Sequence, residues 1–219
     1  MLPNPRPRHS LNLPKLYAIV DADLCARNGR APLDVARAFL SAGAKLIQLR
    51  CKSMGSGAFL DLANAVMECA HAAGATVVIN DRADIAALSQ ADGLHVGQED
   101  LLPLDARKVI GDEPLLGLST HTRDQWERAV RAPVSYIAIG PVFGTATKDT
   151  GYTAGGLQVV RDASAAAAAQ GLPTVAIGGI TRDNAASVVA AGASSVAVIG
   201  DLMNGNPETQ CRAFLSALS

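Results

Sequence analysis

The sequence repeats one local pattern: a helix end rich in small residues, a short apolar run, and then an abrupt cluster of polar residues or glycines. Ala73-Gly74-Ala75 leads through Val77-Val78-Ile79 to Asn80-Asp81-Arg82, and Val175-Ala176-Ile177 runs directly into Gly178-Gly179. In a barrel of parallel strands, the carboxyl end of every strand faces one common mouth. The pattern therefore predicts a fold and also the place where its functional residues gather.

Apolar runs bounded by glycine, proline or polar residues give eight candidate strands. They lie at about residues 15–20, 45–50, 76–80, 92–96, 115–119, 135–140, 173–177 and 195–199. Helical patterns separate them: Pro32 stands at a first helical position, and Thr122 resembles a helix cap. Eight alternating units predict an α/β protein, a closed (β/α)₈ TIM barrel. The alternative, a doubly wound open sheet, lacks its G-x-G-x-x-G turn after the first strand.

The chain of 219 residues has the length of a single domain. We expect residues 1–13 to form a disordered tail and residues 14–219 to form the catalytic barrel. The first ten residues contain three prolines but no apolar signal core. Hydrophobic residues make up 49% of the chain and aromatic residues only 4%, which indicates a core of Ala, Val, Leu and Ile.

A net charge of −1 gives no electrostatic reason to expect binding to nucleic acid or to a membrane, and no apolar stretch is long enough to span a bilayer. Four widely spaced cysteines without a C-x-x-C pair indicate reduced thiols in a cytoplasmic protein. The sequence leaves the possibility of a homo-oligomer open.

Two carboxylates follow adjacent predicted strands. Asp81 comes directly after one apolar run, and Asp100 follows the next. Two carboxylates from neighbouring strand ends can share Mg²⁺, which keeps water and substrate phosphate in the rest of its shell. The alternative is that each Asp caps the helix beginning after it.

Gln48, Arg50 and Lys52 alternate along one strand and its end, so they share one face. That face points into the barrel if Ile47 and Leu49 point outward. Cations inside a barrel need anionic partners, which a phosphorylated ligand would supply. The alternative is an exposed strand end with extended side chains.

Glycines follow the last two strands, where many (β/α)₈ enzymes bind phosphate through backbone N–H groups. Gly178, Gly179 and Gly200 stand at these positions, and a long loop between residues 140 and 156 is a candidate binding loop. Ser119 and His121 lie too close in sequence to indicate a hydrolase triad. His95, on an apolar strand, is more typical of a hydrogen-bonded core histidine than of a catalyst.

Five ordered motifs resemble the thiamine phosphate synthase family from about Leu16 to Met203. They are Gln48-Leu49-Arg50-Cys51-Lys52, Ile79-Asn80-Asp81-Arg82, Gly97-Gln98-Glu99-Asp100, Gly140-Pro141-Val142-Phe143 with Thr145-x-Thr147-Lys148, and Val175-Ala176-Ile177-Gly178-Gly179-Ile180. The resemblance implies that a pyrimidine methyl diphosphate is joined to a thiazole phosphate, with pyrophosphate released and Mg²⁺ as cofactor.

The resemblance also implies the roles of individual residues. Residues holding the pyrimidine diphosphate would be Gln48, Arg50, Lys52, Asn80, Ser119 and Lys148. Asp81 and Asp100 would hold Mg²⁺. The thiazole phosphate would be held by Thr145 and Thr147, with Gly179 and the backbone at Ile199 and Gly200. Pyrophosphate would leave first, so Arg50, Lys52, Lys148 and Ser119 are the candidate catalytic residues for a leaving anion.

Two residues depart from the family pattern: Cys51 stands where Glu is usual, and Gly200 stands where Ser is usual. The nearest alternative function is the related thiazole tautomerase, in which His typically replaces Pro141 and the metal Asp is often missing. Pro141, Asp81 and Asp100 favour the synthase. A barrel that only senses a phosphorylated metabolite, or an unrelated phosphosugar enzyme, is a further alternative.

Overall fold

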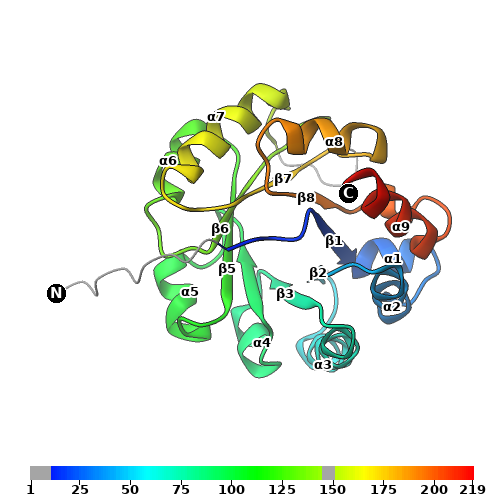
Figure 1. The fold of residues 1–219 in the computed structure, drawn as a ribbon. Coiled ribbons are helices and arrows are strands. Elements are labelled where there is room, and N and C mark those ends of the chain that lie inside the picture. The colour runs from blue at the N-terminus through cyan, green and yellow to red at the C-terminus, as the bar shows by residue number, and fades with distance from the viewer. Residues whose placement is uncertain (1–10, 145–150) are drawn as a thin grey trace.

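The structure is a computed structural model that describes residues 11–144 and 151–219. Eight parallel strands form a closed barrel in chain order, with β8 paired to β1 (Figure 1). The strands are β1 Leu16–Asp21, β2 Leu46–Arg50, β3 Thr76–Asn80, β4 Gly93–Val96, β5 Leu115–Thr120, β6 Tyr136–Ile139, β7 Thr174–Ile177 and β8 Ser195–Val198. The (β/α)₈ prediction is confirmed, and each predicted apolar run overlaps one observed strand.

Helices surround the barrel on its outer face (Figure 1). They are α1 Ala22–Arg27, α2 Pro32–Ala42, α3 Ser56–Ala72, α4 Ala83–Leu88, α5 Pro103–Ile110, α6 Arg123–Ala129, α7 Gly156–Ala168, α8 Arg182–Ala190, the 3₁₀ helix η1 Asp201–Met203, and α9 Pro207–Ala217. Pro32 is the first residue of α2, and Thr122 forms a capping box with Gln125 at the start of α6. Both predicted helix starts are therefore confirmed.

Side chains of β2 alternate between the two faces of the barrel wall. Ile47 and Leu49 belong to the apolar layer between strands and helices. Leu46 lies in the separate cluster inside the barrel, and Gln48 hydrogen-bonds to Tyr17 of that cluster. The predicted inward face of β2 is thus confirmed, and its last residue, Arg50, ends at the mouth.

The segment before β1 belongs partly to the barrel. Leu13 is 6% exposed and packs with the interior cluster, and Leu11 packs against that cluster. At the other terminus, α9 packs against α2 and α8. Among the described residues, no helix is long and apolar enough to cross a membrane.

Candidate active site

Arg50 is held at the mouth by a carboxylate from the neighbouring strand. Its guanidinium forms an ion pair with Asp21, and the two residues are register partners in the β1–β2 ladder. The Asp21 side chain is only 4% exposed, and its other oxygen accepts a hydrogen bond from the Leu24 backbone N–H at 2.9 Å, which caps α1. A single buried carboxylate therefore fixes both the helix start and the direction of Arg50.

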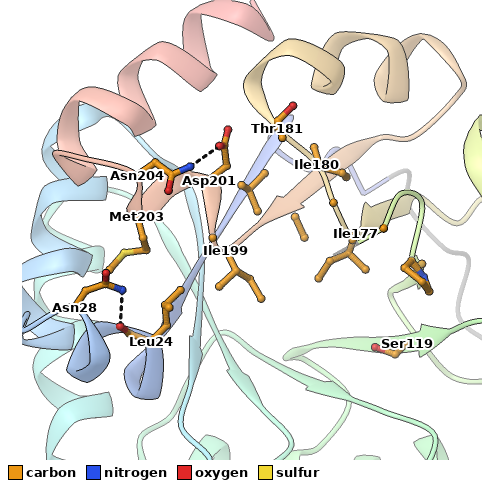
Figure 2. Close-up of a pocket in the computed structure, with 18 of the residues that line it drawn as sticks. Leu24, Asn28, Ser119, Ile177, Ile180, Thr181, Ile199, Asp201, Met203 and Asn204 are labelled. Carbon is orange, nitrogen blue, oxygen red and sulfur yellow. Dashed lines mark hydrogen bonds between the residues drawn. The ribbon is translucent and has the colours of Figure 1, made fainter. Parts of the chain in front are cut away.

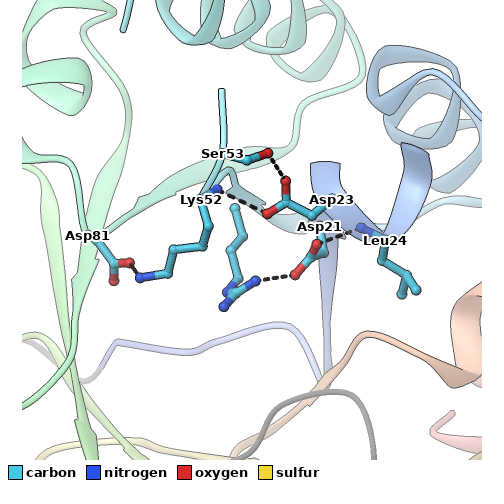
Figure 3. Close-up of polar contacts among 7 residues, drawn as sticks. Asp21, Asp23, Leu24, Lys52, Ser53 and Asp81 are labelled. Atoms are coloured by element: carbon cyan, nitrogen blue, oxygen red, sulfur yellow. Dashed lines mark hydrogen bonds and ion pairs between the residues drawn. The ribbon is translucent and has the colours of Figure 1, made fainter. Parts of the chain in front are cut away.

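Lys52 lies just beyond β2 and bridges two strand ends (Figure 3). Its ammonium group contacts the Asp81 carboxylate, while its backbone N–H donates to Asp23 at 3.2 Å. Asp23 also accepts a hydrogen bond from the Ser53 hydroxyl, which lowers the pKa of that carboxyl. The segment after β2 is therefore anchored by the first turn of α1.

Asp81 and Asp100 lie beside one another at the ends of β3 and β4. Burial raises the pKa of Asp100, and interaction with the Asp81 carboxylate raises it further. The Gly97 backbone N–H donates to Asp100 at 2.7 Å and acts in the opposite sense. Two facing carboxylates repel each other unless a cation lies between or beside them. This donor set fits Mg²⁺, which prefers one or two carboxylates and completes its shell with water and phosphate oxygens.

Neither carboxylate caps the helix that follows it, so the alternative interpretation of these residues is wrong. The cap position of α4 is Arg82 and that of α5 is Leu102, and neither helix has a side-chain cap. Asp81 has a φ of 63°, a left-handed conformation that is uncommon for residues other than glycine. Such conformations cluster at functional sites, where the surrounding structure holds them in place.

A cavity of about 630 Å³ opens on the β5–β8 side of the mouth. Figure 2 shows Ser119 on one side of it and Leu24 with Asn28 on the other. Of the predicted residues, those lining the cavity are Ser119, Gly178, Gly179, Ile199 and Gly200. The carboxyl end of β5 and the segments that follow β7 and β8 therefore lie around one cavity, as predicted.

The glycine pair after β7 is required by the backbone of the neighbouring loop. Gly178 and Gly179 have φ values of 101° and 63°. A Cβ atom on Gly179 would lie 2.4 Å from the Gly144 carbonyl oxygen, and one on Gly178 would lie 2.6 Å from the Pro141 Cα. The pair thus lets the loop after β6 approach the loop after β7, and at these two positions the cavity wall is backbone alone.

The predicted residues fall into two groups at one mouth. Gln48, Arg50, Lys52, Asn80, Asp81 and Asp100 lie on the β2–β4 side and are not among the residues lining the cavity. Gln48 and Asn80 are buried, at 3% and 7% exposure, whereas the Lys52 side chain is 51% exposed. The alternative interpretation, an exposed strand end with extended side chains, therefore fits Lys52 better than it fits Arg50. Thr145, Thr147 and Lys148 lie outside the described residues.

Sequence reasoning missed the residues that position the predicted ones. Asp21 and Asp23 hold Arg50 and Lys52, and their signal was present as two carboxylates at the end of the first strand. His95 is hydrogen-bonded inside the barrel, as expected, but its Nε2 lies 2.9 Å from the Ser119 hydroxyl oxygen. Its Nδ1 faces the phenol of Tyr136, so this serine–histidine contact lacks the carboxylate of a hydrolase triad.

Comparison with known proteins now identifies the family. The family model described as thiamine monophosphate synthase matches residues 16–202. The chain belongs to this family. A thiamine-phosphate synthase of Moorella thermoacetica is 43% identical over 187 residues, covering 84% of this chain and 85% of that protein. A thiamine-phosphate synthase of Koribacter versatilis is 42% identical over 210 residues, covering 95% of this chain and 97% of that protein.

A solved structure shows the same arrangement of elements. The thiamine phosphate pyrophosphorylase from Pyrococcus furiosus superposes with a TM-score of 0.84 at 26% identity, covering 96% of each chain. Membership of the thiamine monophosphate synthase family makes this chain an enzyme of thiamine biosynthesis and a transferase. The resemblance in the sequence motifs is thereby confirmed.

Proposed function

We propose that the chain joins 4-amino-2-methyl-5-(diphosphooxymethyl)pyrimidine to 4-methyl-5-(2-phosphooxyethyl)thiazole, forming thiamine phosphate and releasing pyrophosphate. The single observation that carries the proposal is the cluster at the mouth, where Lys52 contacts Asp81, Asp81 faces Asp100, and Arg50 ends the strand that precedes Lys52. A diphosphate needs cations, and a divalent ion needs carboxylates. Both are present at the carboxyl ends of three adjacent strands, β2, β3 and β4.

The residues on the two sides of the mouth have different parts in this reaction. Arg50 and Lys52 bind the diphosphate oxygens and stabilise the negative charge that grows on pyrophosphate as its bond to the methylene carbon breaks. We assign Gln48, Asn80 and Ser119 to the pyrimidine half, together with Lys148. The cavity lined by Gly178, Gly179, Ile199 and Gly200 receives the thiazole phosphate, and we assign Thr145 and Thr147, which lie outside the described residues, to the same phosphate.

Asp81 and Asp100 are the residues that would hold Mg²⁺. The ion, when bound, supplies Lewis-acid stabilisation of the leaving diphosphate. The Lys52 ammonium contacts Asp81 directly and neutralises part of its charge. We infer that Lys52 turns from Asp81 toward the diphosphate when substrate and ion bind.

We propose the order of bond breaking and bond formation that the family resemblance implies. The carbon–oxygen bond to pyrophosphate breaks first, the aminopyrimidine ring stabilises the methylene cation, and the thiazole nitrogen then supplies the electron pair for the new carbon–nitrogen bond. No proton is removed from the thiazole in this step. The protein therefore needs charge complementarity for the leaving anion more than it needs a general base.

The test is to incubate the purified protein with both substrates and Mg²⁺ and to identify products by mass spectrometry. We expect thiamine phosphate, and we expect EDTA to abolish it. An isomerised thiazole phosphate without coupling would instead support the tautomerase, in which a proton moves and no carbon–nitrogen bond forms. No change in either substrate would contradict both enzymes and favour the sensor.

A further inference from the structure

A network of hydrogen-bonded polar side chains crosses the inside of the barrel and ends at two of the proposed substrate residues. The amide nitrogen of Gln48 donates to the Tyr17 hydroxyl at 2.9 Å, and the Tyr17 and Tyr136 hydroxyls are 3.1 Å apart. The Tyr136 hydroxyl lies 3.0 Å from Nδ1 of His95, and Nε2 of His95 lies 2.9 Å from the Ser119 hydroxyl. Five strands each contribute one residue.

This hydrogen-bonded network is buried and closely packed. Tyr17 and Tyr136 are 1% and 0% exposed, and His95 is 7% exposed. The Tyr136 ring stacks on His95 at a centroid distance of 5.6 Å and meets Tyr17 edge-on at 6.1 Å. Burial raises the pKa of both tyrosines well above their usual range, so both phenols remain protonated and can each donate one hydrogen bond.

Strand β5 leaves space for this network. Gly117 of β5 lies beside it, and a Cβ atom there would be 2.1 Å from Cζ of Tyr136 and 2.5 Å from Nδ1 of His95. Any side chain at this position would displace the phenol and the imidazole together. The backbone of β5 thus leaves room for Tyr136 and His95, the middle of the network.

The amide nitrogen of Gln48 donates at one end of the network, and the directions of the later hydrogen bonds are inferred from that end. We assign the Tyr17 hydroxyl as the donor to Tyr136 and the Tyr136 hydroxyl as the donor to Nδ1 of His95. A neutral His95 then carries its proton on Nε2 and donates it to Ser119. At the two ends, the amide oxygen of Gln48 remains an acceptor and the hydroxyl hydrogen of Ser119 remains a donor.

A 4-aminopyrimidine offers the complementary pattern, because its amino group donates while the adjacent ring nitrogen accepts. A 4-oxopyrimidine offers the reverse, since its oxygen accepts and its ring N–H donates. Resting on the proposed function, we propose that Tyr17, Tyr136 and His95 are positioning residues that orient Gln48 and Ser119, so that the site selects an amino group over an oxo group at the pyrimidine 4-position.

The test uses Tyr136→Phe, which removes the central hydroxyl with little change of volume and touches neither Gln48 nor Ser119 by a hydrogen bond. We measure kcat/KM for the aminopyrimidine diphosphate and for its 4-oxo analogue. The wild type should prefer the amino substrate, and the variant should lose at least about tenfold of that preference, the order expected for one disrupted buried hydrogen bond. Tyr17→Phe should give the same loss if Tyr136→Phe does not fold.

Ser164→Ala is the matched control, because it removes a buried hydrogen bond of 2.8 Å to Thr174 that does not belong to this network. The control should keep the wild-type preference. An unchanged preference in folded Tyr136→Phe and Tyr17→Phe would overturn the positioning role, whereas a wild type that forms no thiamine phosphate would overturn the proposed function instead.

A second measurement does not depend on turnover. In ¹⁵N-histidine NMR spectra, the imidazole signal that disappears in His95→Gln should show the proton on Nε2 in the wild type, and Tyr136→Phe should shift that equilibrium. A proton on Nδ1 in the wild type would overturn the direction assigned to the hydrogen bonds.

Discussion

The ion pair between Asp21 and Arg50 can be tested with one isosteric substitution. Asp21→Asn removes the negative charge but keeps an oxygen that can still cap α1, so the variant isolates the contact with Arg50. The side chains are 4% and 18% exposed, so the Arg50 charge would be left largely buried and without its carboxylate. Losing one partner of a fully buried pair costs about 3–5 kcal/mol, and a retained neutral hydrogen bond together with residual solvent contact reduces this to about 2 kcal/mol.

Such a loss should lower the melting temperature by about 4–8 °C for a chain of this size. The same variant should lower kcat/KM for the pyrimidine diphosphate by about tenfold or more, because a misplaced Arg50 no longer meets the leaving group. Both are measured on purified protein, by calorimetry and by initial rates.

Asp34→Asn is the matched control, because Asp34 forms a 3.7 Å ion pair with Arg37 in which the side chains are 73% and 58% exposed. An exposed pair of this kind is worth about 0.5 kcal/mol or less, so the control should melt close to the wild type. Equal melting temperatures and equal rates for Asp21→Asn and Asp34→Asn would refute the claim that the buried carboxylate positions Arg50.

Three further substitutions or treatments test other parts of the structure. Asp81→Ala should lower turnover by about 10²-fold or more, the usual effect of removing one preorganised electrostatic group, and near-normal steady-state rates would contradict its role. Gly117→Ala should destabilise the protein by about 3 kcal/mol or more, because its Cβ would lie 2.1 Å from Cζ of Tyr136; an unchanged urea midpoint would show that the interior yields. Cys51 is 7% exposed, and burial raises the pKa of its thiol to about 12. Iodoacetamide at about pH 8 should therefore label the more accessible Cys69 first, as measured by peptide mass spectrometry. Early labelling of Cys51 would contradict this.

The sequence was sufficient to predict the barrel because each unit carries its own local signal. Apolar runs, Pro32 at a helix start and the capping residue Thr122 all act within a few residues of themselves. The inward direction of Gln48 followed from the alternation of a strand, which the barrel wall preserves. Strand ends then gathered at one mouth because the strands are parallel.

The positioning residues could not be predicted in the same way, because their roles depend on which strands become neighbours. Asp21 meets Arg50 through the register of β1 against β2. The hydroxyls of Tyr17 and Tyr136 meet across the barrel although 119 positions separate them in the chain. A pattern read along the sequence carries no information about such pairs until the barrel is closed.

The departures at Cys51 and Gly200 have different structural settings. Cys51 is buried, and the negative charges of Asp23 and Asp21 add to the effect of burial in raising its pKa, so it stays a neutral thiol. Gly200 lines the cavity, where only its backbone can contact a phosphate. The first departure alters local packing near Arg50, whereas the second removes a hydroxyl from the proposed phosphate site.

The most direct test of the central claim is the stoichiometry of the two products in one reaction. With both substrates and Mg²⁺ present, the account predicts that thiamine phosphate and pyrophosphate accumulate in equal amounts, and that neither forms when Mg²⁺ is chelated. Pyrophosphate released without an equal amount of thiamine phosphate, or no product at all from folded protein, would contradict the account.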